Sequence, residues 1–183
     1  MQYVQLFEQF IFENKGPHKF GCAMLFFEFP EMKELQKEID KDDLYEEEDD
    51  DSYGLEKEPH VTLLFGFHKE VEPKDIKEIV QGIEFGPIEC TKVSAFENEK
   101  YDVLKFDIKC KELHEANKLL QELPHTNKFK DYVPHATIAY LKSGQAKKYI
   151  KLFKGKKFNP LVKKGVYSMP DGDKISFKVK THD

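Results

Sequence analysis

The stretch PHVTL at residues 59–63 recurs as PHATI at residues 134–138. Each copy holds a histidine and a threonine two positions apart, preceded by proline and followed by an aliphatic residue. The chain has only 7 histidines in 183 residues, so composition alone does not account for two matching copies. The pair therefore indicates two comparable halves, each built around one copy.

Both copies begin an apolar run that predicts a buried strand, with the proline at the strand start, where no ladder hydrogen bond is lost. Side chains alternate between the two faces of a strand, so residues two apart share a face. We therefore expect His60 and Thr62 to point the same way, and His135 and Thr137 likewise. Two such pairs facing each other would surround one small anion with two imidazoles and two hydroxyls.

This set of groups suits the cleavage of a phosphodiester without a metal ion. An imidazole titrates near pH ~6.5, so one ring can accept a proton from the attacking hydroxyl while the other donates one to the leaving oxygen. Thr62 and Thr137 would donate hydrogen bonds to the non-bridging phosphate oxygens. The sequence does not decide whether His60 or His135 acts first as the base.

Paired His-x-Thr motifs, one in each half of a chain, resemble those of the two-histidine (2H) phosphoesterase superfamily. That superfamily includes the bacterial RNA 2′,3′-cyclic phosphodiesterases of the LigT type. Three longer stretches, residues 19–24, 54–66 and 167–172, look most like the phage anti-CBASS enzymes, which degrade cyclic oligonucleotide second messengers. The resemblance covers residues 19–180, and its specific part is the two His-x-Thr motifs.

The resemblance implies an α+β fold with two pseudo-symmetric lobes, in which antiparallel sheets line a central cleft and helices lie outside. It implies a phosphodiesterase that hydrolyses cyclic di- or trinucleotide immune messengers, with His60, Thr62, His135 and Thr137 as catalytic residues and with no cofactor or metal. It also implies a place in the cytoplasm of an infected bacterial host.

Phe20 and Tyr167 are candidates for substrate binding, because aromatic rings stack on nucleobases. Packing in the core is the alternative role for both. The similar phage enzymes often carry tyrosine where Phe20 stands, so this chain lacks a hydroxyl at that position. No acidic residue that would assist the histidines is recognisable near Tyr167.

Other functions remain open at this point. One is an RNA 2′,3′-cyclic phosphodiesterase or 2′-5′ RNA ligase-like enzyme of the LigT type. Another is a nucleotide-binding sponge, although a sponge has no need of two titrating groups. A zinc site at His60 and His135 is a further alternative, but no carboxylate or cysteine stands at recognisable ligand spacing.

The composition predicts one globular domain over residues 1–183, with residues 1–18 as an N-terminal extension of helical pattern. No run of 18 apolar residues is present, and the first residues do not resemble a signal peptide, so we expect no contact with a membrane. The 3 cysteines lack metal spacing and are expected as buried free thiols. The oligomeric state does not follow from the sequence.

The charges are unevenly distributed. Residues 40–58 hold 11 acidic side chains and two lysines, and we expect a solvated acidic loop; residues 128–183 hold 14 lysines and four aspartates. All 29 basic residues are lysine, so a charged contact with phosphate has to come from an ammonium group. The basic C-terminal half favours an anionic ligand, and the acidic loop favours a small nucleotide over long nucleic acid.

Periodicity and turn residues predict the remaining elements. Helices are expected at residues 30–39, 73–81 and 112–123, and a fourth is expected to begin with Ser143 as its cap and to end at Gly155. Strands are expected at residues 21–29, 60–67, 84–96, 101–109, 133–141, 161–168 and 173–180.

Overall fold

The computed structural model describes residues 19–127 and 131–182 of the chain. The elements in these residues are β1 (Gly21–Glu28), α2 (Pro30–Gln36), a 3₁₀ turn (Lys41–Asp43), β2 (His60–Phe67), α3 (Pro73–Gln81), β3 (Glu84–Phe85), β4 (Glu89–Glu97), β5 (Tyr101–Lys109), α4 (Lys111–Leu120), β6 (His135–Lys142), α5 (Ala146–Leu152), β7 (Leu161–Ser168), β8 (Lys174–Phe177) and β9 (Lys180–Thr181). The extension at residues 1–18 lies outside the described residues.

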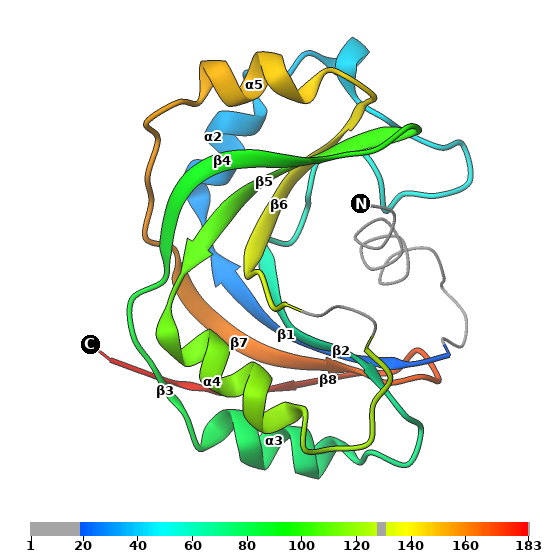
Figure 1. The fold of residues 1–183 in the computed structure, drawn as a ribbon, viewed down its shortest axis with the longest axis vertical. Helices are drawn as coiled ribbons and strands as arrows, with labels where there is room; N and C mark the ends of the chain where they lie inside the picture. The colour runs from blue at the N-terminus through cyan, green and yellow to red at the C-terminus, as the bar shows by residue number, and fades with distance from the viewer. Residues whose placement is uncertain (1–18, 128–130, 183) are drawn as a thin grey trace.

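Two antiparallel sheets form the centre of the molecule (Figure 1). The first sheet has the strand order β2-β1-β7-β8, and the second has the order β4-β5-β6. Helices α3 and α4 lie at the end of the molecule that holds the first sheet, while α2 and α5 lie at the other end, beside the second (Figure 1). The architecture is therefore the α+β fold with sheets inside and helices outside that the sequence predicts.

Most element boundaries match the prediction. Strands β2 and β5 and helix α3 have the expected bounds, and the expected strand at residues 84–96 is divided into β3 and β4. The last expected strand, residues 173–180, is divided as well, because β9 leaves the first sheet and pairs in parallel with β3. In the described part of the chain, no helix has both the length and the apolar character needed to span a bilayer.

Both faces of β1, a central strand of the first sheet, are buried. Along β1, Ala23, Leu25 and Phe27 belong to the main core beneath the helices. The alternate residues, Cys22, Met24 and Phe26, form a separate apolar cluster on the opposite face. The second face lies toward the other sheet, and His60 and Thr62 share it, because they pair with Phe26 and Met24. All three cysteines are buried free thiols, as predicted.

Gly66 allows the loop before β6 to approach the first motif strand. Its φ is +108°, and a Cβ atom at this position would lie 2.1 Å from the carbonyl oxygen of Thr126. The amide of Thr126 donates to the carbonyl of Gly66 at 2.9 Å. The contact fixes the chain that leads into the second motif against the strand that carries the first.

The acidic segment, residues 40–58, is anchored along β6 and is not a simple solvated loop. The amide of Tyr45 donates to the carbonyl of Tyr140, and the amide of Tyr140 donates to the carbonyl of Gly54. The rings of Tyr45 and Tyr53 pack with those of Tyr101 and Tyr140. Most of its acidic side chains remain exposed or partly exposed, so the prediction of solvated carboxylates applies to the side chains and not to the backbone.

The folded chain also brings opposite charges together. Lys148 on α5 forms an ion pair with Asp43 at 2.8 Å, and the ammonium of Lys142 donates to the carbonyl of Asp42. Figure 1 shows the segment around residues 40–45 next to α5. Part of the basic C-terminal half therefore faces the acidic segment, which weakens the argument that all of this charge serves to attract a ligand.

The cap of α5 comes from a distant strand. The carboxylate of Asp102, which is 1% exposed, accepts hydrogen bonds from the amides of Gly144 and Ala146 at 2.9 and 3.0 Å. A negative charge at a helix N-terminus is favourable. The prediction that Ser143 caps this helix is wrong, because its hydroxyl donates to the carbonyl of Asn98 instead.

The side chain of Gln36 joins the two lobes. Its amide nitrogen donates to the carbonyl of Glu56 at 2.8 Å and to the carbonyl of Ile138 at 2.9 Å. Glu56 lies just before the first motif, and Ile138 belongs to the second motif strand. The residue is 8% exposed, so water does not readily replace these bonds.

Replacing Asp102 with alanine is expected to lower the free energy of unfolding by about 2 kcal/mol, because two buried amides lose a charged acceptor. Chemical denaturation of Asp102→Ala would measure this. The exposed Asp49 provides the control, since Asp49→Ala removes the same charge without a buried partner. Equal stability of the two variants would contradict the assigned cap.

The variant Gln36→Met keeps the length of the side chain but removes the side-chain donor to the carbonyl of Glu56 and one of the two donors to the carbonyl of Ile138, which also accepts from the amide of Glu56. We expect a loss of about 1–3 kcal/mol of unfolding free energy, measured by denaturation. The control is Gln121→Met, in which the exposed Gln121 loses one bond, to the side chain of Asn117 four residues earlier. A loss no larger than that of the control would show that Gln36 does not hold the lobes together.

Candidate active site

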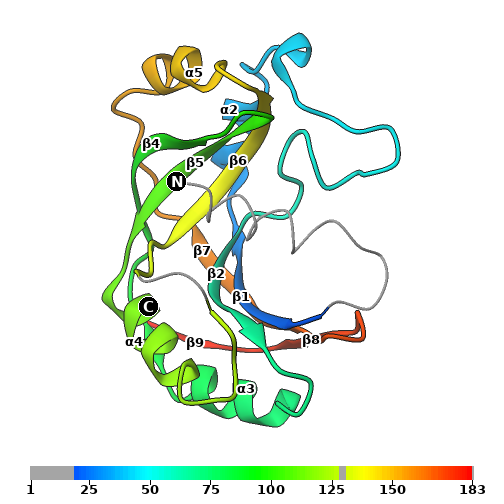
Figure 2. The same ribbon diagram turned by 45° about the vertical axis from the view of Figure 1, so that its right-hand side comes forward.

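The two motif strands meet at the centre of the molecule. Strands β2 and β6 are edge strands of their sheets, and their Cα atoms approach within 8 Å. Each strand begins with its motif histidine, His60 or His135. In Figures 1 and 2 the strands start near the middle and run apart, β6 toward α5 and β2 toward α3.

Matching backbone bonds place the two motifs. The carbonyl of Pro59 accepts from the amide of Phe27 at 2.8 Å, and the carbonyl of Pro134 accepts from the amide of Ile108 at 3.0 Å. Each proline lacks an N–H donor, but its carbonyl oxygen accepts a hydrogen bond from the neighbouring strand and so extends the pairing of the sheet. The strand starts are therefore built in the same way in both lobes.

The two imidazoles are oriented by the same contact. Nδ1 of His60 lies 2.8 Å from the carbonyl of Glu58, and Nδ1 of His135 lies 2.9 Å from the carbonyl of Val133. A carbonyl only accepts, so Nδ1 carries a hydrogen in both rings, and the neutral form is the Nδ1–H tautomer. Nε2 is then the atom of each ring that can take or give a proton to a substrate.

A phenylalanine packs against each motif histidine, and a lysine lies over each phenylalanine. Phe26 stacks on His60 with ring centroids 5.2 Å apart, and Lys164 lies 5.4 Å from the centroid of Phe26. In the second lobe, Phe96 meets His135 edge to face at 5.0 Å, and Lys105 lies 4.3 Å from the centroid of Phe96. These His–Phe–Lys triplets fix the rings and place a cation near each.

The motif threonines are buried, with exposed fractions of 9% for Thr62 and 5% for Thr137. A hydrogen bond connects Thr62 with the thiol of Cys22. Burial raises the pKa of Cys22 to about 12, although the bond from Thr62 and the charge of Lys174 act in the opposite direction. The thiol is therefore protonated at neutral pH and is not a nucleophile.

A cavity of about 110 Å³ lies between the motif strands and includes one residue of each motif, Thr62 and His135. The hydroxyl of Tyr132, a further lining residue, donates to the carbonyl of Thr62 at 2.7 Å. The cavity is lined by Thr62, Leu63, Leu64, Phe65, Phe96, Asn117, Asn127, Asp131, Tyr132, Val133 and His135. His60 and Thr137 lie in the strand positions that the sequence predicts but are not among these lining residues.

The lobes differ in the charged groups around the histidines. An oxygen of the Glu56 carboxylate lies 4.0 Å from Nδ1 of His60, and both side chains are buried. His135 is less buried than His60. The sequence analysis did not identify Glu56 as a partner of His60, although Glu56 stands only four residues before this histidine in the chain.

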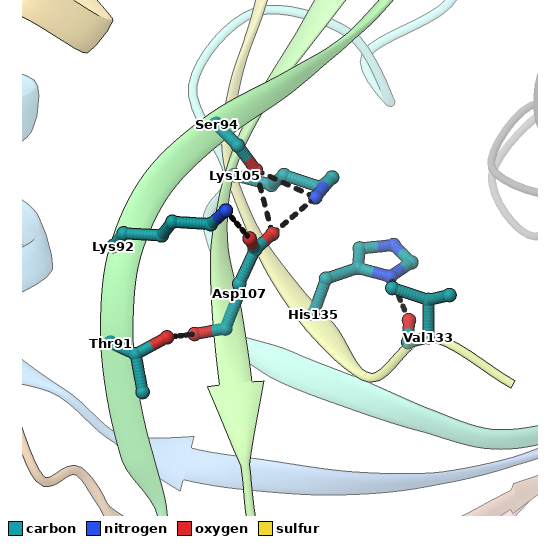
Figure 3. Close-up of polar contacts among 7 residues, drawn as sticks. All are labelled: Thr91, Lys92, Ser94, Lys105, Asp107, Val133 and His135. Carbon is teal, nitrogen blue, oxygen red and sulfur yellow. Dashed lines mark hydrogen bonds and ion pairs between the residues drawn. The ribbon is translucent and has the colours of Figure 1, made fainter.

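A polar cluster on β4 and β5 lies beside the second motif (Figure 3). The ammonium of Lys105 donates to Asp107 at 2.6 Å and to the hydroxyl of Ser94 at 2.8 Å, and Ser94 donates to Asp107. Lys92 lies 3.4 Å from the same carboxylate. The side chain of Lys105 is only 5% exposed. Sequence reasoning missed this cluster, because alternating polar residues on a strand usually face solvent.

The cluster sets the ionisation of its carboxylate. Burial by itself would raise the pKa of Asp107, but hydrogen bonds from Lys105 and Ser94 and the charges of Lys105 and Lys92 outweigh it. The pKa of Asp107 is therefore lower than the ordinary value for aspartate. The carboxylate stays charged well below neutral pH and keeps the lysines paired.

The other candidates have different outcomes. Tyr167 is 0% exposed and packs edge to face on Phe67, so the predicted stacking of Tyr167 on a nucleobase does not fit the structure. Phe20 is partly exposed and contacts Phe65, which lines the cavity, so its role in binding stays a prediction. Within residues 19–127 and 131–182, no three His, Cys, Asp or Glu side chains are grouped as metal ligands.

The lowered pKa of Asp107 predicts how the stability of the protein changes with pH. A carboxyl with a lowered folded pKa adds stability above its unfolded pKa of about 3.9 and loses that stability as the pH falls through the folded value. Between pH ~5 and ~2 the wild-type protein is expected to lose more unfolding free energy than Asp107→Asn, which cannot titrate there. Denaturation at several pH values measures both, and parallel curves would contradict the prediction.

Comparisons with known proteins identify a family and similar folds. The sequence matches the 2′-5′ RNA ligase superfamily over residues 27–160, more than half of the chain. A comparison with curated proteins finds no match.

The structure is similar to that of Usb1 from Kluyveromyces marxianus, with a TM-score of 0.57 and 10% identity over 88% of this chain and 98% of that chain. Usb1 of the same organism with uridine monophosphate gives a TM-score of 0.58 and 9% identity over 88% of this chain and 99% of that one. The PDE domain of MHV ns2 gives 0.51 and 18% identity over 86% and 89%. The structural likeness shows a shared fold, and with the sequence match it follows that the chain belongs to the 2′-5′ RNA ligase superfamily of 2H phosphoesterases.

Proposed function

We propose that the protein is a phosphodiesterase in which His60 and His135 act as the acid–base pair. The observation that carries the proposal is the matched placement of the two imidazoles, each at the start of a central edge strand and each with Nδ1 bonded to a backbone carbonyl. This contact leaves Nε2 of each ring as the proton-transfer atom. Members of the superfamily are phosphodiesterases or RNA ligases, which is consistent with this chemistry.

In the proposed reaction, one imidazole takes a proton from the attacking hydroxyl or water, and the other gives a proton to the leaving oxygen. The P–O bond to the leaving group breaks as the new P–O bond forms. Thr62 and Thr137 donate hydrogen bonds to the non-bridging oxygens, where negative charge increases in the transition state. Acid–base steps of this kind contribute about 10²–10⁴-fold each.

The proposed substrates are cyclic di- or trinucleotide signals, as in the phage anti-CBASS enzymes that parts of the sequence resemble. The acidic segment is anchored beside β6, and its carboxylates would repel a long nucleic acid more than a small nucleotide. The proposal therefore includes a small nucleotide ligand, no partner of duplex length, and action in the cytoplasm of an infected bacterial cell.

A second candidate is cleavage or ligation of RNA ends through 2′,3′-cyclic phosphates. The observation that favours it is the family match itself, to the 2′-5′ RNA ligase superfamily. The acid–base chemistry would be the same, and only the ligand around the phosphate would differ. The two candidates are thus distinguished by substrate and not by mechanism.

The test is a panel of cyclic di- and trinucleotides and RNA with 2′,3′-cyclic ends, incubated with the protein in excess EDTA and resolved by chromatography. Turnover of the cyclic oligonucleotides is expected, and His60→Asn and His135→Asn should each lower it at least about 10²-fold. Asparagine keeps a donor for the carbonyl of Glu58 or Val133 but has no titrating nitrogen.

The control for these variants is His182→Asn, which changes an exposed histidine outside the motifs and should keep full activity. Turnover of the 2′,3′-cyclic ends alone would favour the second candidate. Ligand that binds and is recovered unchanged would identify a sponge and contradict catalysis, as would activity that both asparagine variants retain.

A further inference from the structure

Lys105 is the buried cation beside the second motif. It lies on β5, and its side chain is 5% exposed. Burying an ammonium group costs several kcal/mol unless it is paired, and an apolar residue of similar volume would fill the same space without that cost. Packing alone therefore does not explain a lysine at this position.

The strand register directs Lys105 to the same face as the motif residues. Lys105 pairs with Thr137 across β5 and β6, and Asp107 pairs with His135. Residues opposite each other on neighbouring strands share a face. Figure 3 shows the ammonium of Lys105 and the ring of His135 projecting in the same direction from the sheet. The ring of Phe96 touches both of them.

The charges around Lys105 leave a positive balance. Lys105 and Lys92 share the single carboxylate of Asp107, at 2.6 and 3.4 Å, so these three groups together carry a net charge of +1. Hydrogen bonds to Asp107 and Ser94 hold the ammonium in place. A fixed charge of this kind needs little reorganisation when an anion arrives, which is the condition for effective electrostatic stabilisation.

The corresponding lysine of the first lobe is held less firmly. Lys164 lies over Phe26 at 5.4 Å, against 4.3 Å for Lys105 over Phe96, and it is partly exposed. Its strand partner is Phe26, whereas Lys105 stands opposite the motif residue Thr137. The two triplets are alike in outline, but only the second presents a buried and braced ammonium to a motif threonine.

We propose that Lys105 is the phosphate-binding cation of this site and contacts a non-bridging oxygen of the substrate phosphate next to Thr137. The proposal rests on the proposed function and adds the residue that binds the anion. The chain has no arginine, so an ammonium has to provide the charge that a guanidinium provides elsewhere. Asp107 and Ser94 act as positioning residues that hold Lys105.

Calorimetry with uridine monophosphate as the probe tests the proposal apart from turnover. We expect Lys105→Met to weaken binding by about 10- to 100-fold, the effect of losing a hydrogen bond to a charged group. The matched control is Lys92→Met, which removes the same charge from the same carboxylate but has an exposed side chain. It should weaken binding less than Lys105→Met does, because the charge of Lys92 is 71% exposed and is screened by solvent.

A second variant and the salt dependence of binding separate a lost phosphate contact from a loss of folding. Lys105→Gln retains a donor for Asp107 and Ser94 without the charge, so it serves if the methionine variant does not fold, and thermal unfolding checks both. Raising the salt concentration should weaken binding to the wild type more steeply than to either Lys105 variant. Equal losses in the Lys92 and Lys105 variants, or unchanged binding in the latter, would overturn the proposal.

Turnover provides a separate readout. If the wild type cleaves a phosphodiester, Lys105→Met should lower kcat/KM by a similar factor, while Lys92→Met should lower it less. If the wild type cleaves none but the binding difference is present, the proposed function fails and the assignment of Lys105 as an anion-binding residue stands. Cleavage that persists unchanged in Lys105→Met contradicts the assignment and not the function.

Discussion

The backbone pairing between residues 54–56 and β6 is the constraint on which the site depends. The two sheets share no strand, yet Glu56 donates to Ile138 and Tyr140 donates to Gly54. The pairing is antiparallel, with Leu55 opposite Ala139, so the chain entering the first motif runs beside the strand that leaves the second. Gln36 adds two bonds to this junction. The pairing thus brings together the strands that carry two histidines 75 positions apart.

The site is symmetric in its framework and asymmetric in its charges. Proline and histidine are arranged alike in both lobes, and each imidazole is oriented by the carbonyl two residues before it, although the packed phenylalanine is stacked in the first lobe and edge to face in the second. A carboxylate, Glu56, lies near His60, whereas the second lobe contributes the buried pair of Lys105 and Asp107. The charged groups beside the two imidazoles therefore differ, although their backbone contacts are the same.

Local patterns predicted most of the fold and the placement of the motif pairs. Pro73, Gly82 and the spacing of apolar residues between them predict the start and end of α3. The alternation of side chains along a strand predicts that His60 and Thr62 lie on the same face of β2. Contacts between distant segments could not be predicted. The cap of α5 comes from Asp102 on the distant strand β5, and Tyr167 on β7 belongs to the main core. Lys105 lies on a polar strand face that turns toward the molecule's centre, where an isolated strand pattern suggests water.

The three thiols give the molecule a further property. Burial raises the pKa of Cys22 and Cys90 to about 12 and that of Cys110 to about 11, so each remains a protonated, enclosed sulfur in the native state. Alkylating reagents therefore reach them only when the surrounding structure opens. Cys22 lies on β1, Cys90 on β4 and Cys110 just before α4. The separate rates at which these native cysteines are alkylated would therefore measure the local opening of each part of the structure.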